Sequence, residues 1–135
     1  MLSDINEEVI NSMSERLSQF SQTQFSNCIH DVTNEDSWIE LIDKTEKDFG
    51  KINILVNSAG ISLGADIVST DFEIWKKVHE VNLDSVFLGC KYAIPKMSAH
   101  GHGSIINISS ISGIVAGWNT AAYNSSKAGV RLLSK

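Results

Sequence analysis

Apolar positions along the chain follow two patterns that alternate. Residues 6–20 and 35–49 carry apolar side chains at a spacing of three or four, with polar side chains opposite, which predicts amphipathic helices. Residues 52–56 and 105–108 are nearly continuous apolar runs, as expected of parallel strands that are buried on both faces. The segment 24–29 is a shorter candidate strand. Helices and strands that alternate in this way predict an α/β layer fold.

Polar residues and glycines mark the ends and bends of these elements. Thr33 or Asn34 can cap the helix 35–49, and Gly50 can stop it. Residues 71–98 form one long helical stretch, and we expect it to bend near Asn82. Asparagine is a poor helix former, and a buried amide within an apolar stripe needs a hydrogen-bond partner.

Composition narrows the class of protein. A formal net charge of −5 disfavours nucleic acid or an anionic membrane as a partner. The start of the chain does not resemble a signal peptide, and no apolar run is long enough to span a membrane. Cys28 and Cys90 have neither metal-ligand nor C-x-x-C spacing, so we expect free thiols, a cytoplasmic location and no metal site.

Tyr123 and Lys127 stand four residues apart in a segment, from Ala121 onward, that is predicted as helix. This spacing places both side chains on one face. An ammonium beside a phenol favours the phenolate and lowers the tyrosine pKa from about 10, so the phenol can act as a general acid or base. Taken alone, such a pair is more often an ordinary solvated helix face.

Small polar residues follow the predicted strands. Ser109 and Ser110 close the strand 105–108, and Asn-Ser-Ala-Gly at 57–60 closes the strand 52–56. Ligands of open parallel sheets bind outside the carboxyl ends of the strands. A serine there can polarise a substrate oxygen, and a glycine lets the backbone approach a ligand closely. Each segment is, by itself, also ordinary turn chemistry.

Asp4 follows residues that we interpret as the end of an earlier strand. An acidic residue at this place can accept hydrogen bonds from an adenosine ribose and would repel a 2′-phosphate, which favours NAD over NADP. The alternative is that Asp4 caps the helix 6–20. The two roles are not separable from the sequence.

Together and in this order, the segments resemble the short-chain dehydrogenase/reductase family of the compact type. Asn57-Ser58-Ala59-Gly60 is similar to the family's Asn-Asn-Ala-Gly motif, with Ser58 in place of the second asparagine. Tyr123 and Lys127 match Tyr-x-x-x-Lys. Further matches are the tetrad asparagine at Asn82, the catalytic serine at Ser110, the adenine-flanking pair Asp31-Val32, and the acidic position at Asp4, next to Ile5.

The resemblance implies a doubly wound parallel sheet of the Rossmann-like kind and an NAD(H)-dependent oxidoreductase for a secondary alcohol or ketone. Tyr123 would exchange a proton with the substrate oxygen, which Ser110 orients. Lys127 would lower the pKa of Tyr123 and hold the nicotinamide ribose, and Asn82 would anchor a water beyond it. The implied cofactor-binding residues are Asp4, Ile5, Asp31, Val32, Asn57, Ala59, Gly60, Tyr123 and Lys127.

The resemblance covers residues 1–135 as a single, partial domain. The family's first strand with its Gly-rich turn and its last strands have no counterpart here. In a sheet of order 3-2-1-4-5-6, the strand 52–56 then lacks a neighbour, and free edges favour aggregation. We therefore expect that these residues alone neither fold stably nor turn over substrate, and that the sequence is a piece of a longer enzyme.

Other interpretations stay open. The chain could be a non-catalytic Rossmann-like binding module, a truncated pseudo-enzyme, or a flavodoxin-like regulator that needs no Tyr-Lys pair. For a full-length enzyme, the resemblance implies a homotetramer or homodimer that pairs through 71–98 and 121–135, with Trp75 and Phe87 as core or interface residues. Val115 and Trp118 favour an apolar or alicyclic alcohol as substrate.

Overall fold

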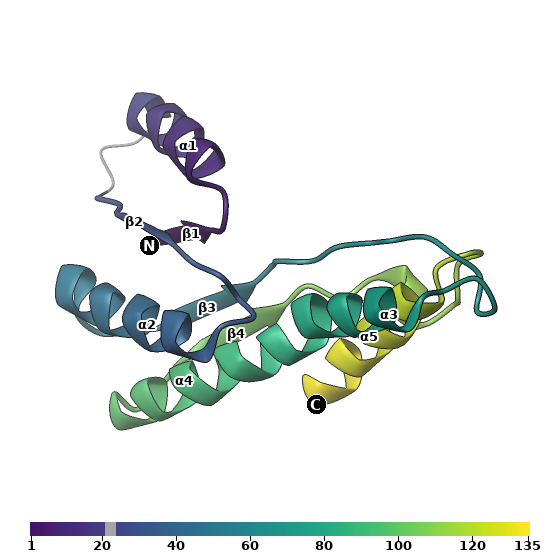
Figure 1. Cartoon of the computed structure of the whole chain (residues 1–135). Coiled ribbons are helices and arrows are strands. Elements are labelled where there is room, and N and C mark those ends of the chain that lie inside the picture. Colours follow the sequence, from purple (N-terminus) through teal and green to yellow (C-terminus); the bar gives the residue numbers. More distant parts are fainter. Residues whose placement is uncertain (21–23) are drawn as a thin grey trace.

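Helices alternate with short parallel strands along the chain, which confirms the α/β fold class. The computed structural model describes residues 1–20 and 24–135 (Figure 1). The strands are β1 (Leu2–Asp4), β2 (Asn27–Ile29), β3 (Ile54–Asn57) and β4 (Ser104–Asn107). The helices are α1 (Glu7–Phe20), α2 (Glu35–Phe49), α3 (Phe72–His79), the π-helical η1 (Glu80–Asp84), α4 (Ser85–Ala99), the 3-10 helix η2 (Ile111–Gly113) and α5 (Ala121–Leu133).

The strands pair in two separate parallel ribbons. β1 pairs with β2, and β3 pairs with β4 in the register Ile54 to Ser104 through Asn57 to Asn107. A small cavity of about 110 Å³ lies between the ribbons and is lined by residues of both, among them Ser3 and Val56. In Figure 1 the β1–β2 ribbon and α1 lie to one side of the β3–β4 ribbon. The described residues therefore form two halves of a sheet rather than one continuous sheet.

Local capping explains where the helices begin and end. The Asn34 side chain accepts a hydrogen bond from the Ser37 amide at 2.9 Å, and Gly50 ends α2 with a φ of 79°, a conformation that favours glycine. At α1 the cap is Asn6, whose Oδ1 accepts from the Glu8 amide at 2.9 Å. Asp4 instead accepts from the Asn6 amide at 2.9 Å. The alternative in which Asp4 caps this helix is therefore wrong.

The long helical stretch changes its winding at the place where the sequence predicts a bend. α3 passes into η1 and then α4 without leaving the helical path, and Asn82 lies within the π-helical turn. Single π-helical turns inside α-helices are frequent at functional sites. α3 and η1 contact α5, whereas α4 contacts α2 and β3. The π-helical turn therefore lies between a part of the stretch that contacts α5 and a part that contacts α2 and β3.

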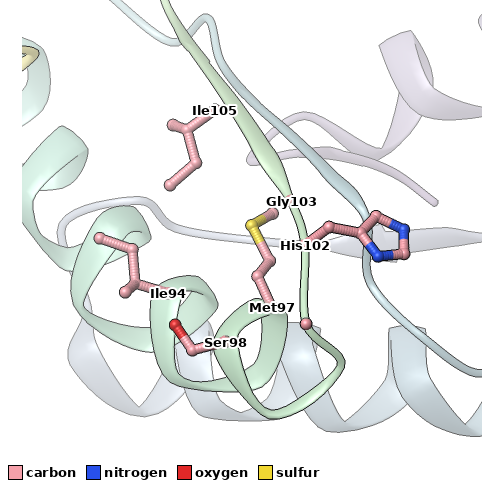
Figure 2. A pocket seen from close by; sticks show the side chains of 7 residues that line it. Ile94, Met97, Ser98, His102, Gly103 and Ile105 are labelled. Atoms are coloured by element: carbon pink, nitrogen blue, oxygen red, sulfur yellow. The ribbon is translucent and has the colours of Figure 1, made fainter.

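The main core lies on one face of the β3–β4 ribbon. Leu55 and Ile105 pack there against a buried cluster from α2, the segment before β3, and α4: Ile42, Ile52, Ala93 and Met97. At the end of α4, Met97 points to Gly103, where no side chain would fit (Figure 2). The same figure shows Ile94 and Ile105 beside it, around a shallow hollow of about 240 Å³.

The opposite face of this ribbon is exposed, so the expectation that residues 52–56 are buried on both faces is wrong. Ile54, Val56 and Ile106 are 66%, 51% and 48% exposed. The physical reason is that α2 and α4 cover only the face with Leu55 and Ile105. On α4, Phe87 is 51% exposed, while Trp75 on α3 is partly buried. The expected oligomer stays a prediction.

In the part of the chain that the structure describes, none of the helices is both long and apolar enough to cross a lipid bilayer.

Candidate active site

The carboxyl ends of β1, β2 and β3 open into one cavity of about 620 Å³. Residues that follow each strand line it, and Lys77 and Val81 from the long helix close the opposite side. This is where open parallel sheets bind ligands. The cavity collects six of the predicted cofactor-binding residues: Asp4, Ile5, Asp31, Val32, Ala59 and Gly60.

Two carboxylates stand at this cavity in different surroundings. Asp4 is exposed at the end of β1. The Asp31 carboxylate accepts hydrogen bonds from the Thr33 amide at 2.9 Å and the Thr33 hydroxyl at 2.8 Å. These bonds, with a smaller attraction to Lys77, hold the pKa of Asp31 below its ordinary value. Both carboxylates thus accept a hydrogen bond from a nearby backbone amide, and Asp4 is the more exposed of the two.

Asn57 was predicted to bind the cofactor, and in this structure its side chain forms a hydrogen bond between the paired strands β3 and β4. Its side chain is 7% exposed and donates from Nδ2 to Asn107 Oδ1 at 2.8 Å, across the β3–β4 pair. It lines the small cavity between the ribbons and not the 620 Å³ cavity. A Cβ at Gly89 would lie 2.5 Å from Asn57 Oδ1, so the glycine lets α4 approach this amide pair. A cofactor contact of Asn57 stays a prediction without geometric support.

Asn82 is the buried centre of the region, with 0% of its side chain exposed. Its Oδ1 accepts from the Ile61 amide at 2.7 Å. Its Nδ2 donates to the Ile61 carbonyl at 2.9 Å and to the Ser126 hydroxyl at 3.0 Å. These three bonds satisfy the amide, as a buried polar group requires, and they join the loop after β3 to η1 and to α5.

Lys127 enters the same region from α5. It is 4% exposed, and its Nζ donates to the Ile108 carbonyl at 2.8 Å and lies 5.9 Å from the centre of the Tyr123 ring. Burial lowers the pKa of Lys127 below its ordinary value, because a charged ammonium is disfavoured away from water. A Cβ at Gly60 would lie 3.3 Å from this Nζ and from Asn82 Oδ1. Gly60, Asn82 and Lys127 therefore meet behind the cavity.

The segment after β4 lies against α5. Ser109 donates from its hydroxyl to the Lys127 carbonyl at 2.8 Å. Ser110 begins η2, where its Oγ accepts from the Ser112 amide at 3.1 Å, so its hydroxyl hydrogen can still be donated to a ligand. The segment after β4 and the helix α5 are thus in contact at Ser109 and Lys127, which are 18 residues apart in the chain.

Ser110 and Tyr123 are not among the described residues that line the 620 Å³ cavity. The structure brings Asn82 and Lys127 together and ties the serine segment to the helix of Tyr123 through Ser109. Their shared catalytic role stays a prediction.

Sequence reasoning missed two residues that hold these groups in place. Asn107 and Ser126 have no pattern of their own, because their partners lie 50 and 44 residues away in the chain. The only available signal was polarity within segments already singled out for chemistry.

Comparisons with known proteins identify the family of this chain. The family described as short chain dehydrogenase matches residues 1–135. The chain is 45% identical over 107 residues to the NADP-dependent (R)-specific alcohol dehydrogenase of Lentilactobacillus kefiri, an alignment that covers 78% of this chain and 42% of that protein. It is 38% identical over 135 residues to the cyclopentanol dehydrogenase of Comamonas testosteroni, covering 99% of this chain and 53% of that one.

Solved structures show the same likeness. The apo form of LigO from Sphingobium sp. strain SYK-6 superposes with a TM-score of 0.93 at 27% sequence identity, over 97% of this chain and 48% of that chain. The chain thus spans about half the length, or somewhat less, of the proteins that it matches.

Proposed function

Because the chain belongs to the short-chain dehydrogenase family, we propose that the protein carrying it is an oxidoreductase that interconverts a secondary alcohol and a ketone with a nicotinamide cofactor. The observation that carries the proposal is the meeting of Gly60, Asn82 and Lys127 at the back of a cavity bounded by three strand ends. A buried ammonium on the same helix face as Tyr123 is the arrangement that acid or base catalysis by a phenol requires.

The cavity suits a dinucleotide. Gly60 lines this cavity, and the exposed carboxylate of Asp4 can accept hydrogen bonds from ribose hydroxyls. When bound, the cofactor supplies or accepts the hydride. Asp31, Val32 and Ala59 would hold its adenosine end.

NAD is the proposed cofactor, because the negative charge of Asp4 disfavours a 2′-phosphate. The Lentilactobacillus relative is NADP-dependent, so the choice needs measurement.

Residues of this chain transfer the proton, orient the substrate and hold the ribose. Tyr123 gives a proton to the ketone oxygen, or takes one from the alcohol, and Ser110 donates a hydrogen bond that polarises and orients the same oxygen. Lys127 stabilises the phenolate form and holds ribose hydroxyls. The bend at Asn82 holds a water that links Lys127 to solvent.

The substrate proposal is an apolar or alicyclic alcohol. Val115 and Trp118, in the loop between η2 and α5, are 67% and 93% exposed and can present apolar surface to a ligand. The relation to cyclopentanol dehydrogenase supports the same class.

The test is a dehydrogenase assay of the full-length protein that contains these residues, with NAD and with NADP, against a panel of acyclic and cyclic secondary alcohols. We expect turnover with a preference for NAD. Tyr123→Phe removes the acidic hydroxyl and should lower kcat by roughly 10²–10⁴-fold while cofactor affinity stays within about twofold.

Tyr92→Phe is the matched control, because it removes the hydroxyl of the other tyrosine in these 135 residues, which donates to Glu35 Oε1 at 2.6 Å on α2. It should keep its activity. Absence of turnover in the wild-type protein, with dinucleotide binding retained, would favour a non-catalytic binding module. Unchanged turnover in Tyr123→Phe would remove Tyr123 from its role.

A further inference from the structure

Two of the three residues between Tyr123 and Lys127 on α5 are serines, and their surroundings differ. Ser126 is 0% exposed. Its hydroxyl donates to the Tyr123 carbonyl at 2.8 Å and accepts from Asn82 Nδ2 at 3.0 Å. The Ser126 hydroxyl therefore donates one hydrogen bond and accepts another. It links the Asn82 side chain of the long helix to the backbone of Tyr123, the predicted acid–base residue.

The Ser126 hydroxyl is one link in a continuous chain of hydrogen bonds. Asn82 binds both the amide and the carbonyl of Ile61, at 2.7 and 2.9 Å, and Ile61 lines the 620 Å³ cavity. The bonds therefore run from the cavity wall through η1 to the first turn of α5. They join three segments that are 21 and 44 residues apart in the chain.

Loss of this one hydroxyl would leave an N–H of the fully buried Asn82 side chain without its partner. An unpaired buried donor is costly, so the neighbourhood would rearrange to pair it. Two movements can do this. The Asn82 amide can turn, which weakens its hold on Ile61, or the start of α5 can shift, which moves Tyr123.

We propose that Ser126 is a positioning residue that keeps Tyr123 in register with the cavity wall at Ile61 by bridging Asn82 to α5. Its effect on turnover rests on the proposed function, whereas the hydrogen-bonded link does not. Small displacements of a reacting group cost rate more than they cost binding, so kcat is the sensitive quantity.

Ser125 supplies a matched control. It has the same side chain on the same turn, but its hydroxyl bonds to the carbonyls of Ala121 and Ala122 in its own helix, at 3.1 and 3.0 Å, and lies 3.0 Å from His79 Nε2. It touches neither Asn82 nor the Tyr123 carbonyl in these bonds. Ser125→Ala removes a hydroxyl from α5 and leaves the bridge intact.

The kinetic test compares Ser126→Ala, Ser126→Thr and Ser125→Ala in the full-length protein. We expect Ser126→Ala to lower kcat by roughly tenfold, with KM for the cofactor within about twofold. Ser126→Thr keeps the hydroxyl and should restore most of the lost kcat, and Ser125→Ala should match the wild type. Unchanged kcat in Ser126→Ala, or an equal fall in Ser125→Ala, overturns the proposal.

A second measurement does not depend on turnover or on whether threonine fits the site. Amide hydrogen exchange at Ile61 reports its bond to Asn82, and in Ser126→Ala we expect exchange about tenfold faster there, with the β3–β4 amides unchanged. Exchange at Ile61 that stays at the wild-type rate overturns the link. If the wild-type protein has no dehydrogenase activity, the proposed function fails while this measurement still decides the role of Ser126.

Discussion

Single buried polar side chains set the geometry of this region, and the sequence identified some of them but not their partners. The spacing of Tyr123 and Lys127 and the polar Asn82 in an apolar stripe are local signals, and they are readable without coordinates. The pairing of Asn57 with Asn107 and of Asn82 with Ser126 is not readable, because it depends on how distant segments pack. The family resemblance placed Asn57 at the cofactor, which stays a prediction, and the structure shows its amide bonded to Asn107 in the sheet.

His30 is a residue-scale case with a pH consequence. It is 2% exposed, its ring centre lies 4.4 Å from that of Trp38 with the two rings nearly perpendicular, and its Nδ1 lies 3.3 Å from the Ser3 hydroxyl. Among the residues that the structure describes, its Nε2 has no hydrogen-bond partner. Burial lowers the pKa of His30 below 6.5, although the nearby Asp31 raises it in part. The folded protein therefore favours the neutral ring.

A ring that is harder to protonate when folded makes stability depend on pH. Above pH 6.5 the ring is neutral in both states, and below it the unfolded chain binds a proton that the folded one resists. The free energy of unfolding of the full-length protein should thus fall as the pH drops below 6.5. The contribution of one such proton is at most about 1.4 kcal/mol per pH unit.

Urea unfolding at a series of pH values between 7.5 and 5.5 measures this dependence, and His30→Phe should show a shallower one. Parallel curves for the two proteins would mean that the ring is not held neutral by burial.

At the scale of helices and strands, periodicity and capping were reliable guides. Gly50 stops α2, and the helical stretch 71–98 is irregular near Asn82, where a bend was expected. What periodicity could not reveal is that the irregularity is a π-helical turn, or that short segments such as η2 pack directly on the backbone of another helix. Those features follow from contacts between elements.

The contact of η2 with α5 gives an element-scale prediction. A Cβ at Gly113 would lie 2.7 Å from the carbonyl carbon and oxygen of Lys127 and 2.9 Å from the Ala128 nitrogen. These are backbone atoms, which cannot rotate away, so Gly113→Ala must push η2 off the helix. We expect a loss of about 1–3 kcal/mol in the free energy of unfolding, measured by urea denaturation of the full-length protein.

Gly117→Ala, in the same loop, is the control. There a Cβ would meet the Thr120 hydroxyl at 3.1 Å, and that side chain can give way. Similar losses in the two variants would show that the contact with α5 is not the cause.

On the scale of the whole molecule, the sequence predicted the fold class and a strand with a free edge, and the structure has two ribbons instead of one sheet. The burial of the strands was overestimated, because apolar composition indicates what a strand can bury and not which neighbours cover it. Ile54, Val56 and Ile106 form an exposed apolar face on the β3–β4 ribbon.

This exposed face and the separate ribbons predict that the 135 residues by themselves unfold without cooperativity. Circular dichroism should show helix with no sharp thermal transition, and a dye that binds exposed apolar surface should fluoresce strongly with this chain and weakly with the full-length protein. A cooperative melt together with dehydrogenase activity in the 135-residue chain would contradict the prediction.

The π-helical turn has a consequence for how this chain tolerates change. Each residue of an α-helix rotates the path by about 100°, and a π-helical turn accommodates one residue more than an α-helical turn does. The extra residue therefore offsets the azimuth of α4 from that of α3, so Val78 and Ala93 are both buried although the two halves face different neighbours. A one-residue deletion in 80–84 would restore uniform α-helical winding and rotate α3 or α4 away from the elements that it packs against. Point substitutions on the outer surface would leave the relative rotation of α3 and α4 unchanged.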